Sequence, residues 1–281
     1  MRALDASIIK EKVKMLLLES NYNIGEKTFE ILRKSFESET NLVSRAVLEQ
    51  IIKNDEIALD ENIPMCQDTG MAVIFLEIGQ EVYLTGKNLY DSVNEGVKEA
   101  YDIGYLRKSV VDDPLFDRIN TNDNTPCIIH TDITPGSQIK ITVAPKGFGS
   151  ENMSAIKMLK PSDGVEGVKK FVIETVKKAG PNPCPPIVLG IGVGGTFEKC
   201  AYMAKKALTR EIGEHNTSIK YSNLEKELLE EINKLNIGPA GLGGKTTALA
   251  VHIEYFPTHI AGLPVAVNIC CHAYRHDSIT I

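Results

Sequence analysis

The spacing of apolar residues predicts helices in the first sixty residues of the chain. Apolar side chains recur three and four positions apart, which places them on one face of an α-helix. They are Ile8, Ile9, Val13, Leu16 and Leu17, then Phe29, Leu32 and Phe36, then Val43, Ala46, Val47, Ile51 and Ile52. We expect this segment to be a helical region that carries no chemistry.

The rest of the chain alternates short apolar runs with helical patterns. The runs MAVIFLEIG, IVLGIGV, LAVHIEYF and LPVAVNICC predict buried strands. Helical patterns are expected at about 87–103, 164–178, 197–208 and 224–235. No internal repeat interrupts this order. The sequence therefore predicts an α+β fold in which mixed sheets pack with helices behind a helical N-terminal region.

Two further strands, CIIHTDI and QIKITVAP, are separated by the turn-forming residues TPGS. This spacing predicts a hairpin-like pair. A glycine-punctuated loop at 146–150 follows the second strand. The stretch GPNPCPP is rich in proline, which forbids regular structure, so it predicts a rigid loop before IVLGIGV.

Charge and hydropathy exclude several classes of protein. The formal net charge is −6 and the pI is about 5.6, and no run of basic residues provides the positive surface that nucleic acid requires. The N-terminus mixes charges into its apolar positions, unlike a signal peptide, and no apolar run reaches the ~20 residues of a membrane span. We expect a cytoplasmic protein that binds neither nucleic acid nor membrane.

Six cysteines in a cytoplasmic chain are not expected to form disulfides, because the cytosol is reducing. Cys66 lies in PMCQDTG and Cys184 in NPCPP, and both stretches predict loops. A proline-flanked loop thiol loses little entropy on binding a metal. Cys127 and Cys200 fall inside a predicted strand and a predicted helix, where we expect them to pack in the core.

The third loop thiol comes from the adjacent pair Cys270 and Cys271 in NICCHAYRH. In an extended chain the two side chains point to opposite faces, and the residues alone leave the choice open. Three scattered thiolates suit an iron–sulfur cluster with one open iron, because structural zinc usually takes close Cys pairs. From spacing alone, a zinc site or no metal remains an alternative.

Two glycine-rich stretches resemble nucleotide-binding motifs. Gly190, Gly192 and Gly195 form G-x-G-x-x-G after a strand, but the sequence about 20 residues later contains no second apolar strand ending in an acid. The stretch GLGGKTT around Lys245 lacks one glycine of the phosphate-binding pattern, since Pro239 stands there. A nucleotide cofactor is therefore not favoured at the first stretch, and a tight turn is the favoured interpretation of the second.

The chain resembles a known family along nearly its whole length. The matching stretches, in family order from about residue 5, are PMCQDTG, YLRKS, APKGFGSENMS, GPNPCPP with GIGVGGT, IGPAGLGGKT and FPTHIAGLPVAVNICCHAYRH. They are similar to the alpha subunit, or N-terminal domain, of class I fumarate hydratase and L-tartrate dehydratase. The resemblance implies that residues 1–281 are one alpha-type catalytic domain, with a helical region at about 1–60.

The resemblance also implies a 4Fe-4S cluster. Its ligands would be Cys66, Cys184 and, from the match of the final motif, Cys271 rather than Cys270. The open iron of such a cluster can act as a Lewis acid on the hydroxyl that leaves a 2-hydroxy dicarboxylic acid. The expected enzyme is a hydro-lyase that reversibly dehydrates such an acid, with malate to fumarate, a reaction of the tricarboxylic acid cycle, as the first expectation and L-tartrate as the alternative.

The family's other functional residues fall on five positions. Gln67, Arg107 and Gly149 are the implied substrate contacts, the last in the glycine-rich loop at 146–150. Arginine suits this role because its guanidinium binds carboxylates through two hydrogen bonds. Asp68 and His259 are the implied catalytic pair that handles protons.

The resemblance implies that the chain works with a partner. Further substrate-binding residues come from a C-terminal domain in the single-chain members of the family, and this sequence ends at Ile281. We therefore expect a beta subunit, and pairing of two alpha chains into a heterotetramer. The alternatives from other classes are a metal-stabilised binding protein without catalysis and a nucleotide-binding enzyme.

Overall fold

The structure is a computed structural model that describes residues 2–281, and its internal contacts divide the chain into two units. Unit 1 comprises Met1–Ile24, Asn54–Phe148 and Arg275–Ile281, and unit 2 comprises Gly25–Lys53 and Gly149–Tyr274. Each unit thus combines segments that are far apart in the sequence. The expected single catalytic domain over 1–281 stays a prediction.

The helical N-terminal region is confirmed. Its helices are α1 (Ala6–Tyr22), α2 (Glu26–Ser38) and α3 (Leu42–Glu61). The Asp5 carboxylate accepts a hydrogen bond from Ser7 N at 2.9 Å, which satisfies one of the unpaired donors at the start of α1. A short strand that the pattern did not predict, β1 (Arg2–Asp5), precedes α1 and pairs in parallel with β3 (Val82–Thr85).

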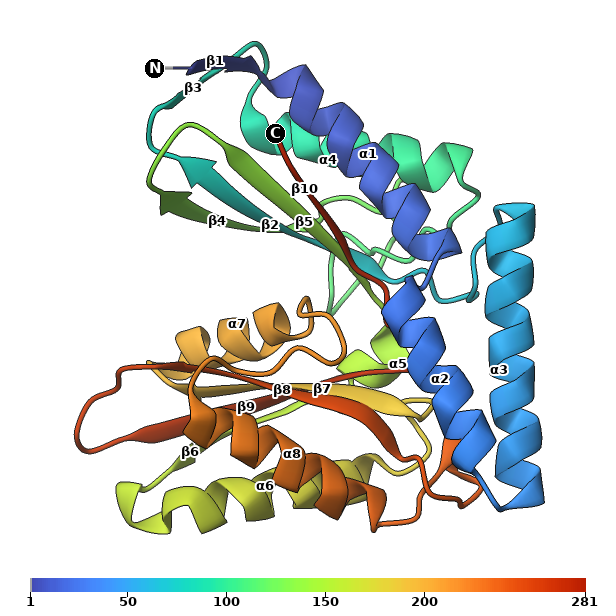
Figure 1. The fold of residues 1–281 in the computed structure, drawn as a ribbon. Helices are drawn as coiled ribbons and strands as arrows, with labels where there is room; N and C mark the ends of the chain where they lie inside the picture. The colour runs from blue at the N-terminus through green and yellow to red at the C-terminus, as the bar shows by residue number, and fades with distance from the viewer. Residues whose placement is uncertain (1) are drawn as a thin grey trace. The chain divides into compact units, whose positions relative to one another are not determined.

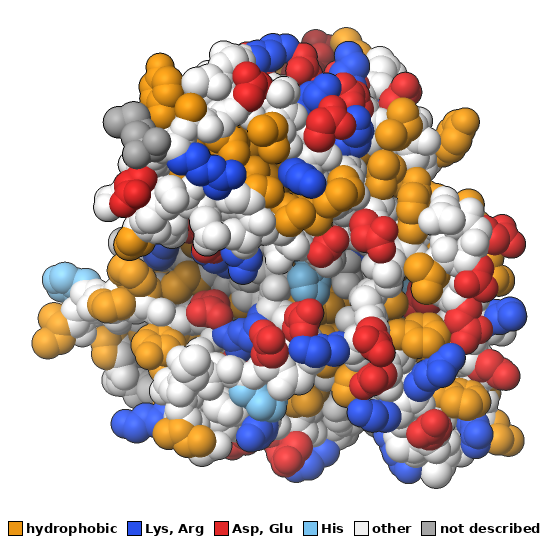
Figure 2. Space-filling model, turned by 45° about the horizontal axis from the view of Figure 1, so that its top comes forward, with side chains coloured by type: hydrophobic (Ala, Val, Ile, Leu, Met, Phe, Trp, Pro, Cys, Tyr) orange, Lys and Arg blue, Asp and Glu red, His pale blue; other side chains and the backbone are white. Residues whose placement is uncertain are grey.

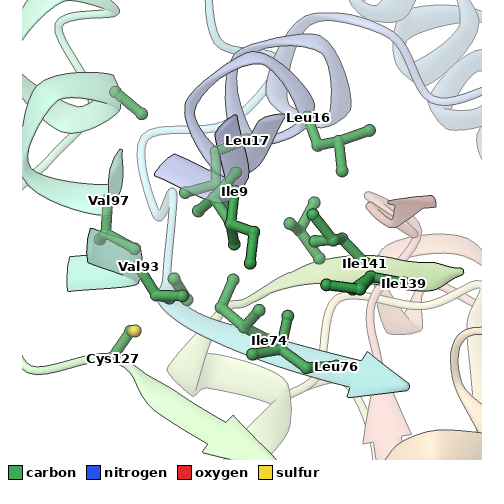
Figure 3. Packing of buried hydrophobic residues seen from close by; sticks show 14 of the residues in the cluster. Ile9, Leu16, Leu17, Ile74, Leu76, Val93, Val97, Cys127, Ile139 and Ile141 are labelled. Carbon is green, nitrogen blue, oxygen red and sulfur yellow. The ribbon is translucent and has the colours of Figure 1, made fainter. Parts of the chain in front are cut away.

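Unit 1 is built on a four-stranded mixed sheet with the order β10-β5-β2-β4. Its strands are β2 (Met71–Gly79), β4 (Ile128–Thr134), β5 (Ile139–Lys146) and β10 (Asp277–Thr280). Helices α1 and α4 (Leu89–Ile103) lie along one face of this sheet (Figure 1). Figure 3 shows the core between these two helices and the sheet. Side chains of both helices point towards Ile74, Leu76 and Ile141 on the sheet.

The predicted hairpin of β4 and β5 is wrong. Strand β2 lies between them, parallel to β4 and antiparallel to β5. β2 is buried along nearly its whole length, whereas β4 exposes Ile128, Thr131 and Ile133. The most apolar strand therefore takes the centre of the sheet, and the turn chemistry of TPGS does not overcome that burial.

Unit 2 contains a second mixed sheet with the order β6-β9-β7-β8. Its strands are β6 (Ala155–Leu159), β7 (Ile187–Gly194), β8 (Ala248–Phe256) and β9 (Leu263–Cys270), and its helices include α6 (Gly164–Ala179), α7 (Phe197–Ala207) and α8 (Ile219–Asn233). Within this unit α7 lies on one face of the sheet and α6 and α8 on the other (Figure 1). The predicted 146–150 loop contains a helical turn, α5 (Phe148–Glu151). Together the two sheets and their helices confirm the α+β class.

The glycines of the G-x-G-x-x-G stretch have a packing role. A Cβ on Gly190 would lie 2.1 Å from Ala204 O, and one on Gly192 would lie 2.0 Å from Cys200 O. Both acceptors belong to α7. These glycines therefore let α7 approach β7 closely, which accounts for the motif without a bound nucleotide.

The surface shows mixed charge where it can be seen. On the face in Figure 2, Lys and Arg side chains lie among Asp and Glu side chains rather than in one basic patch. No helix among the described residues is long and apolar enough to cross a membrane.

Replacing Gly192 with alanine should destabilise unit 2. The new Cβ would overlap the main chain of α7, because Cys200 O lies 2.0 Å from its position, and overpacking of this kind costs about 1–3 kcal/mol. Chemical denaturation of the purified chain measures the loss. Gly262→Ala is the control, since its Cβ would have no neighbour closer than 3.8 Å. Equal stability of the two variants would contradict the packing role of Gly192.

Candidate active site

The 66–70 loop of unit 1 joins α3 to β2 and carries Cys66, Gln67 and Asp68. The residue before Cys66 is fixed on both sides. Met65 N donates to Asn21 O at 3.0 Å, and Asn54 Nδ2 donates to Met65 O at 2.8 Å. The half-buried thiol of Cys66 therefore starts from a backbone that α1 and α3 hold in place.

The far end of the same loop is held by buried polar side chains. The Tyr101 hydroxyl lies 3.0 Å from Thr69 O and 2.8 Å from Gly70 O, so it donates to this pair of carbonyls. Asn124 Nδ2 donates to Gly70 O at 3.2 Å. Tyr101 and Asn124 are both fully buried, and burial raises the pKa of the Tyr101 phenol above its ordinary value, so it remains a donor.

Asp68 connects this loop to the glycine-rich segment after β5. Its Oδ1 accepts from Gly70 N at 3.1 Å and its Oδ2 accepts from Phe148 N at 2.8 Å. A Cβ on Gly147 would lie 3.0 Å from Asp68 Oδ2, and one on Gly70, where φ is +75°, would lie 2.4 Å from the carbonyl carbon of Lys146. Glycine at both positions thus permits the close approach of the two loops.

Arg275 holds Asp68 from the other side. Its Nη2 donates to Asp68 O at 2.7 Å and its Nη1 donates to Asn21 Oδ1 at 3.0 Å. The guanidinium is buried, so it binds main chain rather than solvent. Gln67 and Arg107, by contrast, are exposed, and Thr69 Oγ1 donates to Arg107 O at 3.2 Å. Unit 1 therefore brings three predicted site residues, Gln67, Asp68 and Arg107, to one loop system beside Cys66.

In unit 2, Cys184 lies on the 181–186 loop in an unusual backbone conformation. Its φ is +53°, a left-handed value that β-carbon-bearing residues rarely adopt, and its side chain is exposed. Cys184 N donates to Pro181 O at 3.0 Å, which closes the turn. Strained backbone of this kind clusters at functional sites, because the surrounding structure must maintain it.

The structure places Cys271 and Gly149 beside the Cys184 loop. His272 N donates to Cys184 O at 3.3 Å, so the loop after β9 meets the loop before β7. Cys270 is buried at the end of β9 while Cys271 is half-buried, as expected for neighbours that point to opposite faces. A Cβ on Gly149 would lie 3.8 Å from Asn182 O, which brings α5 to the same place.

The thiols fit an iron–sulfur cluster in the kind of donor and in their setting. None of the six cysteines forms a disulfide, and Cys66, Cys184 and Cys271 are the three that are not buried. Within residues 2–281 the structure contains no group of three or more His, Cys, Asp or Glu side chains arranged to hold a metal ion. Cys184 and Cys271 lie on adjoining loops of unit 2, and Cys66 lies in unit 1.

His259 lies away from the cysteines of unit 2. It is on the exposed connection between β8 and β9, where its Nδ1 accepts from Ala261 N at 3.2 Å. Cys271 follows the opposite end of β9, and seven steps of about 3.3 Å separate the ends of that strand by roughly 23 Å. His259 instead borders a mainly apolar cavity of about 400 Å³ with Tyr221 and Leu224 of α8.

The carboxylate of Glu39 binds the main chain of the GLGGKTT loop from within unit 2. Its Oε2 accepts from Lys245 N at 2.7 Å, and its Oε1 accepts from Thr40 N at 2.8 Å and Asn41 N at 2.9 Å. A Cβ on Gly244 would lie 2.7 Å from Glu39 Oε2. Burial alone would raise the pKa of Glu39, but the backbone donors outweigh it and lower the pKa.

This internal contact also supports the loop that carries Cys184. Ala240 N donates to Pro185 O at 2.8 Å, and Ile187 N donates to Thr247 O at 2.9 Å. The glycine-rich loop held by Glu39 therefore forms hydrogen bonds with the proline-rich loop at two places. One lies just after Cys184, and the other lies at the start of β7. The structure supports the interpretation of GLGGKTT as a tight structural turn.

Cys127 and Cys200 pack in the core, as predicted. Both are buried, and burial raises the pKa of the Cys127 thiol to about 12 and also raises the pKa of Cys200.

The supporting residues Tyr101 and Asn21 were not predicted. Asn21 gave a signal, since it continues the buried stripe of Val13 and Leu17 at a spacing of four, where an apolar residue is expected.

Comparison with known proteins agrees with the motifs. The profile of the fumarate hydratase (Fumerase) family matches residues 10–280. A protein of Methanocaldococcus jannaschii, named provisionally as L(+)-tartrate dehydratase subunit alpha, is 45% identical over 271 residues, which cover 95% of each chain. The L(+)-tartrate dehydratase subunit alpha of Escherichia coli K12 is 34% identical over 254 residues, covering 89% of this chain and 83% of the relative.

The family profile and the relatives place this chain in the class of hydro-lyases. The chain belongs to the fumarate hydratase (Fumerase) family. This membership confirms the family and the enzyme class that the motifs indicated.

Asp55 is a buried carboxyl close to this site. It lies on α3 next to Asn54, and the residue is 4% exposed. Its Oδ2 has no hydrogen-bond partner among residues 2–281. Burial raises the pKa of Asp55 to about 7, although the Asn54 amide opposes the shift. Below a pH of about 7 the folded chain therefore favours the protonated form of Asp55.

Asp55→Asn should stabilise the chain at alkaline pH. The raised pKa means that Asp55 contributes its full stability below its unfolded pKa of ~3.9 and loses it as the pH rises to about 7. At about 1.4 kcal/mol per pH unit, the variant gains up to about 4 kcal/mol at pH 8. Urea denaturation from pH 4 to pH 8 measures this. Parallel pH curves for the wild type and the variant would show that Asp55 does not titrate in this way.

Proposed function

We propose that this chain is the alpha subunit of a 4Fe-4S hydro-lyase that reversibly dehydrates a 2-hydroxy dicarboxylic acid. One observation carries the proposal. The hydrogen bond from His272 N to Cys184 O sets the loops of two thiols, Cys184 and Cys271, side by side in a member of a hydro-lyase family. The subunit names of the relatives support the alpha assignment and a beta subunit as partner.

Cys66, Cys184 and Cys271 would hold the cluster. A 4Fe-4S cluster has four irons, so thiolates on three loops would leave one iron without a protein ligand, and thiolates are the usual ligands of such clusters. When bound, the cluster supplies a Lewis acid for the departing hydroxyl group. Cys184 suits a ligand better than a packing residue, because its side chain is exposed and its backbone is held in a left-handed conformation.

Three residues of unit 1, Gln67, Asp68 and Arg107, would contribute to substrate binding and proton transfer. Arg107 is exposed, so its guanidinium can bind one substrate carboxylate through paired hydrogen bonds, and the exposed Gln67 amide can orient the substrate beside it. Each oxygen of Asp68 accepts one backbone hydrogen bond and keeps further acceptor capacity. We assign Asp68 as the proton-handling carboxylate, fixed in direction by Gly70 and Phe148.

His259 would act in the site of a second alpha chain. The length of β9 separates it from Cys271 of its own chain, and it lies on an exposed connection whose Ile260 is 90% exposed. Pairing of two alpha chains through this connection would bring His259 to the partner's cysteines. The proposed pairing agrees with the expected alpha–alpha contact and would retain the Asp68–His259 pair across two chains.

L(+)-tartrate is the substrate we place first. The relatives at 45% and 34% identity carry that name, whereas the family profile is described as fumarate hydratase and supports malate as the second candidate. The two acids undergo the same elimination of water. In each of them one carbon carries the hydroxyl group that leaves, and the adjacent carbon carries the hydrogen that is removed as a proton. Tartrate gives an enol that becomes a 2-oxo acid, and malate gives fumarate.

Anaerobic reconstitution with iron and sulfide tests the cluster. The wild-type chain should acquire the visible absorption of a 4Fe-4S cluster and, after one-electron reduction or oxidation, an electron paramagnetic resonance signal. Cys184→Ser and Cys271→Ala should lose at least about nine-tenths of bound iron, because two thiolates no longer suffice. Cys270→Ala is the matched control and should keep the cluster. Retention in Cys271→Ala with loss in Cys270→Ala would overturn the ligand assignment.

Turnover by the reconstituted alpha–beta complex tests the substrate and Asp68. We expect dehydration of L(+)-tartrate to exceed that of malate, and Asp68→Asn to lower kcat about 100-fold or more with the cluster spectrum unchanged. Malate as the better substrate would select the second candidate. Full activity of Asp68→Asn would remove the proposed proton-handling role.

A further inference from the structure

Residues 108–122 of unit 1 form a hairpin between α4 and β4. Val111 and Asn120 form an antiparallel bridge, Asp112 N donates to Ile119 O at 2.9 Å, and Thr121 N donates to Val110 O at 2.9 Å. The segment is therefore an ordered hairpin rather than an open loop. We refer to it as the 108–122 hairpin.

The tip of the hairpin is built by its own hydrogen bonds. The Asp113 carboxylate accepts from Leu115 N at 2.8 Å, Phe116 N at 3.1 Å and Asp117 N at 3.3 Å. These backbone donors, Leu115 first, lower the pKa of Asp113. Arg118 Nη1 donates to Pro114 O at 2.5 Å. The conformation of the tip thus rests on polar contacts within it and not on packing of its apolar side chains.

Those apolar side chains point to solvent. Leu115 is 71% exposed, Phe116 is 82% exposed and Ile119 is 60% exposed. A single exposed apolar residue is ordinary, but three large ones between positions 115 and 119 of one ordered hairpin are the kind of feature that marks a protein interface. Aromatic anchors such as Phe116 are also typical of interface centres.

Both ends of the hairpin are attached to the candidate active site. At the first end, Thr69 Oγ1 donates to Arg107 O at 3.2 Å. At the other end, Asn124 Oδ1 accepts from Ser109 N at 2.7 Å while its Nδ2 donates to Gly70 O at 3.2 Å. A protein seated on the tip is therefore fixed relative to the 66–70 loop and to Arg107.

The charge of the hairpin indicates what kind of partner it fits. The hairpin carries three carboxylates, Asp112, Asp113 and Asp117, and one guanidinium, Arg118. Its other cation, Lys108, is paired with Asp102 at 2.9 Å. Two copies of this acidic tip would repel each other, which disfavours a second alpha chain there. A partner with a basic rim around an apolar pocket is complementary. The relatives are named as alpha subunits, so a beta subunit is the partner other than a second alpha chain.

We propose that the tip of the 108–122 hairpin is the docking point of the beta subunit, which receives Leu115, Phe116 and Ile119 in an apolar pocket with a basic rim. The inference rests on the proposed function, since it names the surface that the partner of that enzyme uses. Docking there sets the beta subunit beside Arg107, where it can complete the substrate site.

Binding of the cognate beta subunit to hairpin variants tests the inference. Phe116→Glu should raise the alpha–beta dissociation constant about 30-fold or more, as loss of an interface anchor does. Leu42→Glu is the matched control, since Leu42 is 83% exposed at the start of α3, and its affinity should stay unchanged. Asp117→Lys should weaken binding several-fold and reduce its dependence on salt.

Each other outcome overturns the inference. If Phe116→Glu binds the beta subunit like the wild type but raises KM, the tip covers the substrate instead. If it splits a dimer of the alpha chain alone, the tip contacts a second copy, and if it lowers the melting temperature of the isolated alpha chain, the tip packs within the chain. A wild-type complex that forms but dehydrates neither acid would refute the proposed function. The effect of Phe116→Glu on binding would still test the docking surface. Failure of the wild-type chains to associate would refute both.

Discussion

The hydrogen bonds of Asp68 are the constraint on which the candidate site of unit 1 depends. One carboxylate joins the 66–70 loop to the segment that follows β5, and its main-chain carbonyl is held by Arg275 from the end of the chain. This arrangement requires glycine at position 70, because a Cβ there would overlap the main chain of Lys146, and it leaves little room for a side chain at position 147. Contacts within the chain therefore hold the loops of this site, as effective positioning of reacting groups requires.

The periodicity of the sequence was sufficient for most helices and for the central strands. α1 and α6 have clear apolar stripes, and β2 and β7 are nearly continuous apolar runs. Strand order was not predictable, because it depends on which strand gains most from a central position and not on the nearest turn. Short edge strands such as β1 and β10 lack a pattern of their own, since their partners define them.

The candidate site divides along a similar line. The loop thiols could be recognised from their prolines and neighbours, whereas the choice of Cys271 over Cys270 needed the family motif, and the structure agrees that Cys270 is the buried one. The buried supports, Tyr101 and Asn124, act through long-range hydrogen bonds that no local pattern encodes. The position of His259 at the far end of β9 likewise follows from strand direction, which sequence spacing alone does not give.

The contact of Glu39 with the glycine-rich loop has a consequence for how the chain responds to its surroundings. A loop of this kind that bound free phosphate would change its occupancy with the phosphate concentration of the cell. Here the anion is tethered to the same polypeptide, so its effective concentration at the loop is high and constant. The geometry of the neighbouring proline-rich loop, which carries Cys184, therefore does not depend on the concentration of small anions.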